Sequence, residues 1–291
     1  MKNILITGAN GLLGHQVCQD CLQGEHKVLG LVRTLPHAPL SGVTYLPIDL
    51  NGNWHAENLP AHADAIIHLA QSPNFRDFPN SALEVFRVNL ESTAKLLDYA
   101  KHAGVKRFIL ASSGGLYGTS EQAHTESSAI LTSGKLDYYL TSKLASEMLA
   151  QNYSHIFQTT ILRFFFIYGP HQSQNMLMPR LLNNISQGKI ITLQGVDGIR
   201  INPIHVADAS AAVLASLETK ESDIINIAGP DILSIREICS EMGSVLGITP
   251  TFDIQPGEPA ALIGDIKRMR EKLHQPKIRL SDSINALLRS K

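Results

Sequence analysis

Residues Asn3–Thr7, with the sequence NILIT, run directly into the segment Gly8-Ala9-Asn10-Gly11-Leu12-Leu13-Gly14. An apolar strand, closely spaced glycines and a following helical pattern together predict a turn that binds the phosphates of a dinucleotide. Gly8 permits a tight turn, Gly11 lets backbone N–H groups approach a pyrophosphate, and Gly14 lets helix and strand pack closely. A purely structural glycine turn is the less favoured alternative, because the strand, the glycine spacing and the helix all agree.

Short apolar runs alternate with helical patterns through the first two thirds of the chain. Buried parallel strands separated by helices predict an α/β fold with a doubly wound parallel sheet of the Rossmann type. One amphipathic stretch covers residues 82–102, where apolar side chains recur near one face. The expected strands are residues 3–7, 27–32, 43–47, 63–69, 106–111 and 158–165.

The pattern changes after Gly169-Pro170. Residues 249–259 are expected to be a loop, because they are rich in turn formers. The other elements expected here are a helix at 178–187, a strand pair at 190–193 and 200–205, a helix at 206–217 and a strand at 223–228.

Two lobes follow from this change of pattern. We expect a dinucleotide-binding Rossmann core of residues 1–169, which residues 204–230 rejoin at the sheet. Residues 170–203 and 231–291 are expected to form a small C-terminal substrate-binding lobe.

Composition narrows the classes of protein and partner. The 291 residues are 44% hydrophobic, and their net charge of −1 gives no basis for a nucleic-acid or membrane-surface partner. No apolar run approaches the roughly 20 residues that cross a bilayer, and the apolar start is interpreted as the first strand of a cytoplasmic protein, not as a signal peptide. Cys18 and Cys21 have no second Cys/His pair nearby, so no metal site is expected; both are expected to be half-buried on one helix face, and Cys239 to lie in the core.

The segment Tyr139-Leu140-Thr141-Ser142-Lys143 places a tyrosine and a lysine at positions i and i+4 of a predicted helix. A free tyrosine has a pKa of about 10 and is a poor acid–base group at neutral pH. A neighbouring ammonium favours the phenolate, and bringing this pKa near 7 needs about 4 kcal/mol of differential stabilisation. Tyr139 and Lys143 are therefore candidates for an acid–base pair, although the same spacing also arises on solvated helix faces.

The hydroxyl pair Ser112-Ser113 ends a buried apolar run. Open α/β sheets bind ligands at the carboxyl ends of their parallel strands. Ser113 is therefore a candidate to hydrogen-bond the substrate oxygen on which Tyr139 acts. The alternative is a serine that only caps the strand.

These elements, in this order, resemble the extended short-chain dehydrogenases, the NAD(P)-dependent epimerase/dehydratase family, which acts mainly on sugar nucleotides. The resemblance covers nearly the whole chain and includes the glycine spacing T-G-x-x-G-x-x-G. Ser113 stands at the family's catalytic Ser/Thr position, and Tyr139 and Lys143 match its Y-x-x-x-K pair. The other matching segments are residues 68–70 (HLA), 88–93 (VNLEST), 111–118 (ASSGGLYG), 162–170 (LRFFFIYGP), 200–208 (RINPIHVAD) and 225–229 (INIAG).

The resemblance implies which residues bind the cofactor and the substrate. The cofactor residues it implies are Gly8, Asn10, Gly11, Leu12, Leu13, Gly14, Arg33, Asp49, Leu50, Leu69, Ala70, Asn89, Tyr139, Lys143 and Phe165. The substrate residues it implies are Ser113, Phe166, Asn175 and Arg200.

Two positions depart from the family pattern. Phe166 stands where the family usually has an asparagine that hydrogen-bonds the substrate; the alternative is that its ring packs inward against the sheet and never meets the substrate. Met176 stands where another asparagine often lies, although Asn175 adjoins it. Arg200 keeps the family's diphosphate-binding arginine, and its guanidinium suits an anionic substrate tail, unless it is only an exposed charge.

The end of the second strand indicates the cofactor. NAD enzymes place an Asp or Glu about 20 residues after the glycines, where it binds the ribose 2′-hydroxyl. Val32 takes that position, and Arg33 can pair with a 2′-phosphate, so NADP(H) is expected and NAD is the alternative. The resemblance assigns Asp49 to the adenine of either cofactor.

Hydride transfer at a carbinol or ketone carbon of a sugar nucleotide fits two reactions. One-way reduction of a keto sugar is slightly favoured, because Phe166 makes the pocket less polar and Arg33 indicates NADPH. An NAD-dependent nucleotide-sugar 4-epimerase is the main alternative; a non-sugar reductase and a non-catalytic dinucleotide-binding sensor are less favoured. Gly114-Gly115 replace the Asp-Glu pair of the family's dehydratases, so no 4,6-dehydratase activity is expected. The family expectation is a homodimer formed through helices that flank the sheet.

Overall fold

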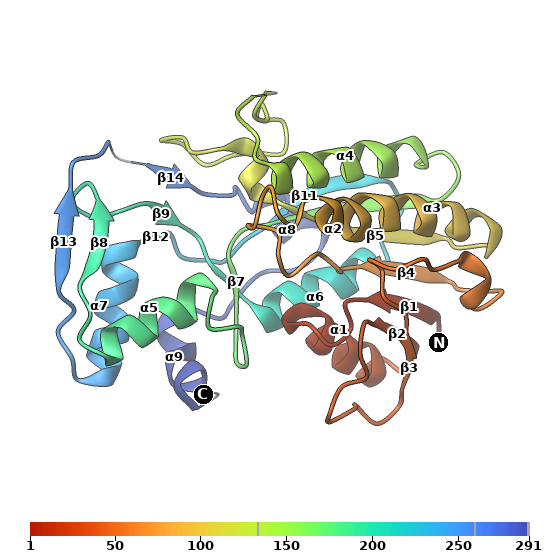
Figure 1. The fold of residues 1–291 in the computed structure, drawn as a ribbon, viewed down its shortest axis with the longest axis horizontal. Coiled ribbons are helices and arrows are strands. Elements are labelled where there is room, and N and C mark those ends of the chain that lie inside the picture. Colours follow the sequence, from red (N-terminus) through yellow and green to blue (C-terminus); the bar gives the residue numbers. More distant parts are fainter. Residues whose placement is uncertain (133, 259, 290–291) are drawn as a thin grey trace. The chain divides into compact units, whose positions relative to one another are not determined.

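The computed structural model describes residues 1–132, 134–258 and 260–289. The chain forms two compact units, each assembled from three segments (Figure 1). The first unit comprises Met1–Leu116, Leu131–Arg163 and Ser210–Ile225. The second unit comprises Tyr117–Ile130, Phe164–Ala209 and Asn226–Lys291.

A doubly wound sheet is the framework of the first unit. Its strands are β1 (Asn3–Thr7), β2 (Lys27–Val32), β3 (Val43–Pro47), β4 (Ala65–His68), β5 (Arg107–Ser113), β6 (Gln158–Phe164) and β11 (Asp223–Ile227). Their order is β11-β6-β5-β4-β1-β2-β3, so the chain leaves β3 at one edge and returns to β4 on the other side of β1. Strands β1 to β5 pair in parallel. This topology confirms the predicted fold class.

The first three strands have the bounds predicted from their apolar runs. The strand expected at residues 106–111 runs on to Ser113, so both serines of the hydroxyl pair belong to β5. Leu5, Ile66 and Phe108, from neighbouring strands, pack with Leu97 in one buried apolar cluster.

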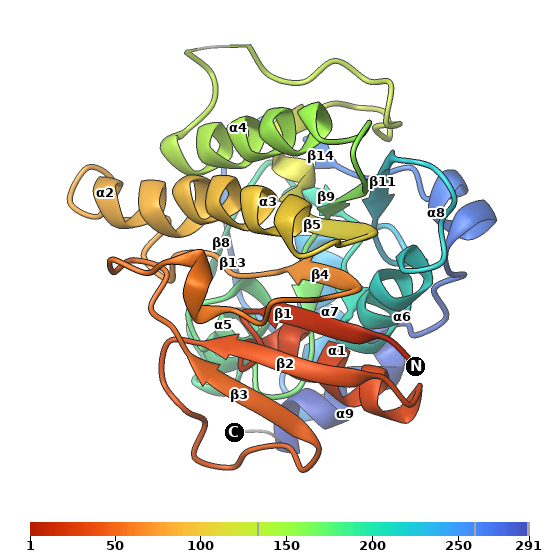
Figure 2. The same cartoon turned by 90° about the vertical axis from the view of Figure 1, so that its right-hand side faces the viewer.

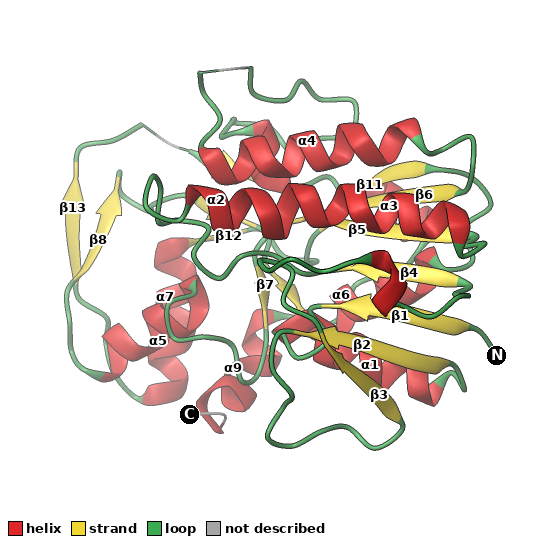
Figure 3. Cartoon of the chain, turned by 45° about the vertical axis from the view of Figure 1, so that its right-hand side comes forward, coloured by secondary structure: helices red, strands yellow, loops and turns green. Residues whose placement is uncertain are grey.

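Helices cover both faces of this sheet. α3 (Ser92–His102) and α4 (Tyr138–Asn152) lie side by side over one face, and α1 (Leu12–Gln23) lies over the other (Figure 2, Figure 3). Cys18 and Cys21 are fully buried on α1, deeper than the half-buried position expected from the sequence, and neither forms a disulfide.

The helix expected at residues 82–102 has three parts: α2 (Ala82–Val85), a π-helical turn η2 (Phe86–Glu91), and α3. Side-chain hydroxyl groups donate hydrogen bonds to two carbonyl oxygens of η2. Ser92 Oγ donates to the Val88 oxygen, and the Asn89 oxygen accepts from Thr93 Oγ1 and Ser146 Oγ. Side-chain hydroxyl groups therefore bond to backbone carbonyl oxygens inside the π-helical turn.

The second unit contains short strands and helices. Its strands are β7 (Ile167–Tyr168), β8 (Ile191–Gln194), β9 (Arg200–Ile201), β10 (Ile204–His205), β12 (Leu233–Ser234), β13 (Phe252–Gln255) and β14 (Ala261–Leu262). Its helices are α5 (Leu177–Ser186), the start of α6 (Val206–Ser216), α7 (Ile235–Leu246), α8 (Lys267–Lys272) and α9 (Leu280–Arg289). Met178, Leu182, Ile238, Cys239 and Ile284 share its apolar core.

The expected strand pair at residues 190–193 and 200–205 is wrong. β8 pairs with β13, which lies inside the stretch expected to be a loop. Proline and glycine residues flank this four-residue strand, and their turn-forming character predicts a loop instead. The second range is divided at Asn202-Pro203 into β9, which pairs with β12 and β14, and β10, which pairs with β7. Proline has no N–H to donate to a ladder, so the strand cannot run through it.

Among the described residues, no helix combines the length and the apolar composition of a membrane span.

Candidate active site

The glycine turn after β1 has a backbone that side chains would disrupt. Gly8 has a φ of +68°, and its carbonyl oxygen accepts a hydrogen bond from the Gly11 N–H at 2.9 Å. A Cβ atom at Gly14 would lie 2.0 Å from that same Gly8 oxygen. The close packing predicted for Gly14 is therefore observed, and both positions require glycine.

The N-terminus of α1 is open to an anion. Gly11 precedes the helix, no side chain caps the first turn, and no acidic residue occupies it. Leu12 and Leu13 begin this twelve-residue helix. Its first backbone N–H groups and its dipole suit a pyrophosphate, so the turn fits the dinucleotide that the sequence predicts.

The loop after β4 lies directly against this turn. A Cβ atom at Gly8 would be 3.1 Å from the Ala70 Cα and 3.3 Å from the Leu69 carbonyl carbon. The Ala70 N–H donates to Thr7 Oγ1 at 3.1 Å. Leu69 and Ala70, both predicted to bind the cofactor, thus adjoin the glycine turn.

The residues predicted to bind the adenosine half follow β2 and β3. Because these strands pair in parallel, Arg33 and Asp49 lie at the same edge of the sheet. Both side chains are exposed, whereas Leu50 is buried. Arg33 forms no ion pair with another described residue, and Asn10 Nδ2 donates to the neighbouring Thr34 carbonyl oxygen at 3.3 Å.

α4 carries the candidate acid–base pair. The Asp137 carboxylate caps the helix by accepting from the Leu140 N–H at 2.7 Å. Lys143 is 5% exposed, its Nζ lies 5.8 Å from the centre of the Tyr139 ring, and it donates to the Ala111 carbonyl oxygen at 3.0 Å. Burial lowers the pKa of Lys143 to about 8, and the Glu147 carboxylate opposes that decrease.

Tyr139 is half-buried among groups from three segments. Its hydroxyl donates to Gln71 Oε1 at 3.3 Å, and its ring centre lies 4.7 Å from that of Phe75. Ser113 Oγ accepts from the Gly115 N–H at 3.1 Å and is hydrogen-bonded to the Tyr139 phenol. Burial raises the pKa of Tyr139 to about 12, although its bond to Ser113 and the Arg76 guanidinium act in the opposite direction. In this structure, burial therefore outweighs the decrease expected from a neighbouring ammonium.

Asn89 is buried on η2, and this chain engages both ends of its amide. Its Oδ1 accepts from the Ser72 N–H, and its Nδ2 donates to Ser142 Oγ, both at 2.9 Å. These bonds connect the loop after β4 to α4. A contact between Asn89 and the cofactor stays a prediction.

Both ring nitrogens of His68, at the end of β4, are hydrogen-bonded to hydroxyl groups. Its Nδ1 is hydrogen-bonded to Thr7 Oγ1 at 2.7 Å, and its Nε2 to Thr93 Oγ1 at 3.0 Å. Burial, and secondarily the Lys143 charge, lower the pKa of His68 to about 3. The imidazole is therefore neutral and connects the glycine turn to α3.

Sequence reasoning missed a buried ion pair behind the candidate acid–base pair. Arg163 Nε and one terminal nitrogen contact the two Glu147 carboxylate oxygens at 2.9 and 2.6 Å. The only available signals were that Glu147 stands four residues after Lys143 and that Arg163 lies in a family-like segment. Neither signal shows that the two residues meet.

The second unit holds the remaining predicted residues. Phe165 is buried, and its ring stacks 6.2 Å from that of Tyr117. Phe166 has a φ of +47° and packs, half-buried, against the apolar core of this unit. Asn175 is exposed just before α5, and Arg200 is exposed at the start of β9. The packing observed for Phe166 is thus on the core of the second unit, whereas the alternative placed it against the sheet, and its contact with substrate stays a prediction.

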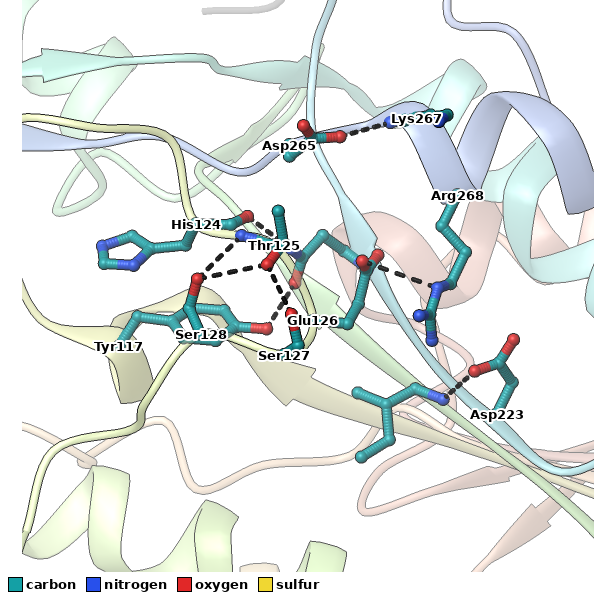
Figure 4. Close-up of polar contacts among 12 residues, drawn as sticks. Tyr117, His124, Thr125, Glu126, Ser127, Ser128, Asp223, Asp265, Lys267 and Arg268 are labelled. Atoms are coloured by element: carbon teal, nitrogen blue, oxygen red, sulfur yellow. Dashed lines mark hydrogen bonds and ion pairs between the residues drawn. The ribbon is translucent and has the colours of Figure 1, made fainter.

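A polar cluster in this unit is internally satisfied (Figure 4). The Glu126 carboxylate accepts from the Asn226 N–H at 2.9 Å and lies 3.6 Å from Arg268 Nε. Tyr117 donates to Asn226 Oδ1 at 2.9 Å, and the His124 ring stacks on Tyr117 at 4.8 Å. These contacts hold the segment around Glu126 in place, and the Glu126 carboxylate serves in them as a structural acceptor.

Comparison with known proteins gives matches to one family. The sequence profile of the NAD dependent epimerase/dehydratase family matches residues 4–228. An uncharacterized UDP-glucose epimerase of Bacillus subtilis (strain 168) is 27% identical, over 97% of this chain and 95% of its own length. A dTDP-4-dehydro-6-deoxy-D-allose reductase of a Streptomyces species is 26% identical, over 93% of this chain and 90% of its own length.

A solved structure matches almost the whole chain. It is that of UDP-glucuronic acid 4-epimerase from Bacillus cereus in complex with UDP-glucuronic acid and NAD. It superposes with a TM-score of 0.86 at 27% identity and covers 99% of this chain and 98% of its own.

Proposed function

Since the chain belongs to the NAD-dependent epimerase/dehydratase family, we propose that this enzyme is a 4-epimerase of a UDP-linked hexose or hexuronic acid. The observation that carries the proposal is the grouping of Ser113, Tyr139 and Lys143 at the carboxyl end of β5. The Bacillus cereus epimerase, similar over nearly its whole length, supports epimerisation more than the reduction expected from the sequence.

The three grouped side chains have distinct roles in this proposal. As a phenolate, Tyr139 takes the proton of the sugar hydroxyl when the carbon is oxidised and returns it when the ketone is reduced. Ser113, bonded to the phenol, orients the same oxygen. Lys143, as an ammonium, stabilises the phenolate that burial disfavours.

The glycine turn, the start of α1 and the Leu69-Ala70 segment would hold the nicotinamide dinucleotide. When bound, the dinucleotide supplies the hydride acceptor and donor and a positive charge beside the phenol. The protein contributes placement and electrostatics. The position of Arg33 favours NADP(H), but the matched structure holds NAD. We propose NAD, because an epimerase returns the hydride to its own substrate and consumes no cofactor.

The second unit would bind the substrate in this proposal. Arg200 is exposed and suits the diphosphate, while Asn175 suits the sugar or nucleotide. The lobe expected from the sequence, residues 170–203 and 231–291, remains our proposal for the part of the chain that selects the substrate.

A homodimer is also proposed. Leu83 on α2, Phe86 on η2 and Met148 on α4 are exposed apolar side chains on elements that pack against one another. A second copy would cover them through the helices that flank the sheet. The cytoplasm stays the proposed location, which the three free cysteines favour.

The direct test incubates the purified enzyme with UDP-glucuronic acid or UDP-glucose and NAD, and separates the epimers by chromatography. We expect interconversion of two epimers without net reduction of NAD. Net oxidation of NADPH with a nucleotide-linked 4-keto-6-deoxyhexose, and no epimerisation, would establish the reductase in its place.

A further inference from the structure

The buried ion pair behind α4 joins a helix to a strand. The side chains of Arg163 on β6 and Glu147 on α4 are 5% and 1% exposed. Two parallel N–H···O contacts fix the carboxylate in the plane of the guanidinium. Removing two charges from water is expensive, and such a pair is weak evidence for stability by itself. Because Glu147 lies on the same helix as Tyr139 and Lys143, the pair is placed where it can act on them.

Glu147 faces the same side of α4 as the acid–base pair. Tyr139, Lys143 and Glu147 follow one another at intervals of four residues, so their side chains form one row along the helix. Lys143 is buried and has a carbonyl oxygen, Ala111 O, as its hydrogen-bond acceptor. A buried ammonium with a neutral acceptor tends to lose its proton. The Glu147 carboxylate opposes that loss by raising the pKa of Lys143.

Other titratable groups on the elements around α4 do not supply a negative charge to Lys143. His68 on β4 is neutral, and β5 presents the Ala111 carbonyl. Glu84 on α2 accepts from Ser72 and Asn74, and Glu91 on η2 pairs with Lys95 on α3 at 2.8 Å. Arg87 on η2 is exposed.

We infer that the Arg163–Glu147 pair is a positioning pair for Lys143: the guanidinium fixes the carboxylate, and the carboxylate keeps the lysine an ammonium at neutral pH. The inference rests on the proposed roles of Tyr139 and Lys143. Without Arg163, the Glu147 carboxylate would be buried unpaired and would tend to take up a proton. Its charge would then no longer act on Lys143.

The test measures the protonation of Lys143 in the protein without substrate. The chain is labelled with lysine enriched in ¹³C at Cε, and the resonance missing in Lys143→Met identifies Lys143. Titration over about pH 6 to 11 then gives its midpoint. We expect Glu147→Gln to lower that midpoint by about one pH unit or more. Glu91→Gln, which removes an exposed carboxylate from a neighbouring helix, should leave it unchanged.

A second variant protects the test against misfolding. Glu147→Gln leaves the Arg163 charge buried, whereas Glu147→Gln combined with Arg163→Gln removes both charges and keeps two amides that can hydrogen-bond. The double variant should also show the lowered midpoint, and Glu147→Asp should restore most of it. An unchanged Lys143 midpoint in the folded double variant would overturn the inference. Because no substrate is present, failure of the epimerase assay would not affect this reading.

The pH dependence of kcat supplies a second measurement. In the variants that lower the midpoint, loss of turnover toward alkaline pH should begin about one pH unit earlier than in the parent. A merely structural pair would reduce kcat or the midpoint of thermal unfolding without moving the pH profile.

Discussion

The Lys143 Nζ lies 5.8 Å from the centre of the Tyr139 ring, one helical turn away on α4. The ammonium donates its hydrogen bond to the Ala111 carbonyl oxygen, so in the proposed mechanism it would act on the phenol through its field. Burial pushes both residues toward their neutral forms, because it raises the pKa of Tyr139 to about 12 and lowers that of Lys143 to about 8. The proposed chemistry needs the charged form of each residue: a phenolate at Tyr139 and an ammonium at Lys143.

Tyr139→Phe should reduce kcat at least about 100-fold, because only the group that transfers the proton is lost. Cofactor affinity should stay within a few-fold of the parent value. Tyr138→Phe is the matched control: this adjacent ring stacks on Phe78 at 5.0 Å, away from the proposed chemistry. Turnover in Tyr139→Phe within a few-fold of the parent would refute the assigned role.

Lys143→Met should abolish turnover, weaken cofactor binding and make the protein more stable at neutral pH. The decrease of the Lys143 pKa from 10.5 to about 8 means that burying its charge costs roughly 3 kcal/mol below pH 8. Between about pH 8 and 10.5 the unfolded chain binds more protons, so the stability of the parent rises with pH. The advantage of the variant should therefore shrink over that range.

Urea unfolding at several pH values checks this prediction. The free energy of unfolding of Lys143→Met should exceed that of the parent most at pH 7 and least above about pH 10.5. A variant less stable than the parent at pH 7 would show that the Lys143 hydrogen bond to Ala111 outweighs the cost of its buried charge.

Phe166→Asn should be less destabilising than Phe166→Ala, by about 1 kcal/mol. Phe166 has a φ of +47°, a conformation that asparagine adopts more readily than a bulky residue or alanine. Both variants lose the packing of the ring against the second unit's core, so their difference isolates the backbone strain. Chemical denaturation measures it; equal destabilisation would mean that the strain is negligible.

NAD should bind more tightly than NADP. Arg33→Ala should leave the affinity for NAD within a few-fold and weaken NADP binding, because only NADP has the 2′-phosphate that the exposed guanidinium can reach. Calorimetric titration of the parent and of Arg33→Ala with NAD and with NADP gives the four dissociation constants. Tighter binding of NADP by the parent would restore the choice expected from the sequence.

The enzyme should have no 4,6-dehydratase activity. Removal of water needs an acid and a base, and Gly114 and Gly115 provide neither. Glu126, an acidic residue that follows these glycines in the sequence, contacts Arg268 and accepts a hydrogen bond from the Asn226 N–H. Formation of a 4-keto-6-deoxy product from dTDP-glucose would contradict this expectation.

Local patterns predicted the parts of the fold that local physics determines. β1, β2 and β3 are short, mainly apolar runs with turn residues nearby, and their bounds were predictable. β13 is four residues long and flanked by proline, so its pairing with β8 depends on tertiary contacts that no window of sequence contains.

The candidate site shows the same division. The glycine turn and the Tyr139–Lys143 spacing are short-range patterns, and the sequence reveals them. The contact between Glu147 and Arg163 joins residues 16 positions apart on different elements. The left-handed backbone of Phe166 is imposed by its surroundings, because its own side chain disfavours it.

The π-helical turn η2 fixes a rotational phase between two helices. One residue occupies about 100° of an α-helix, so deleting a single residue within Phe86–Glu91 would let the segment wind as an α-helix and turn α2 by about that angle against α3. The exposed Leu83 side chain on α2 would then turn by that angle relative to α3. The orientation of Leu83 and its neighbours on α2 is therefore set by one extra residue in the turn, whose carbonyl oxygens accept from the hydroxyl groups of Ser92, Thr93 and Ser146.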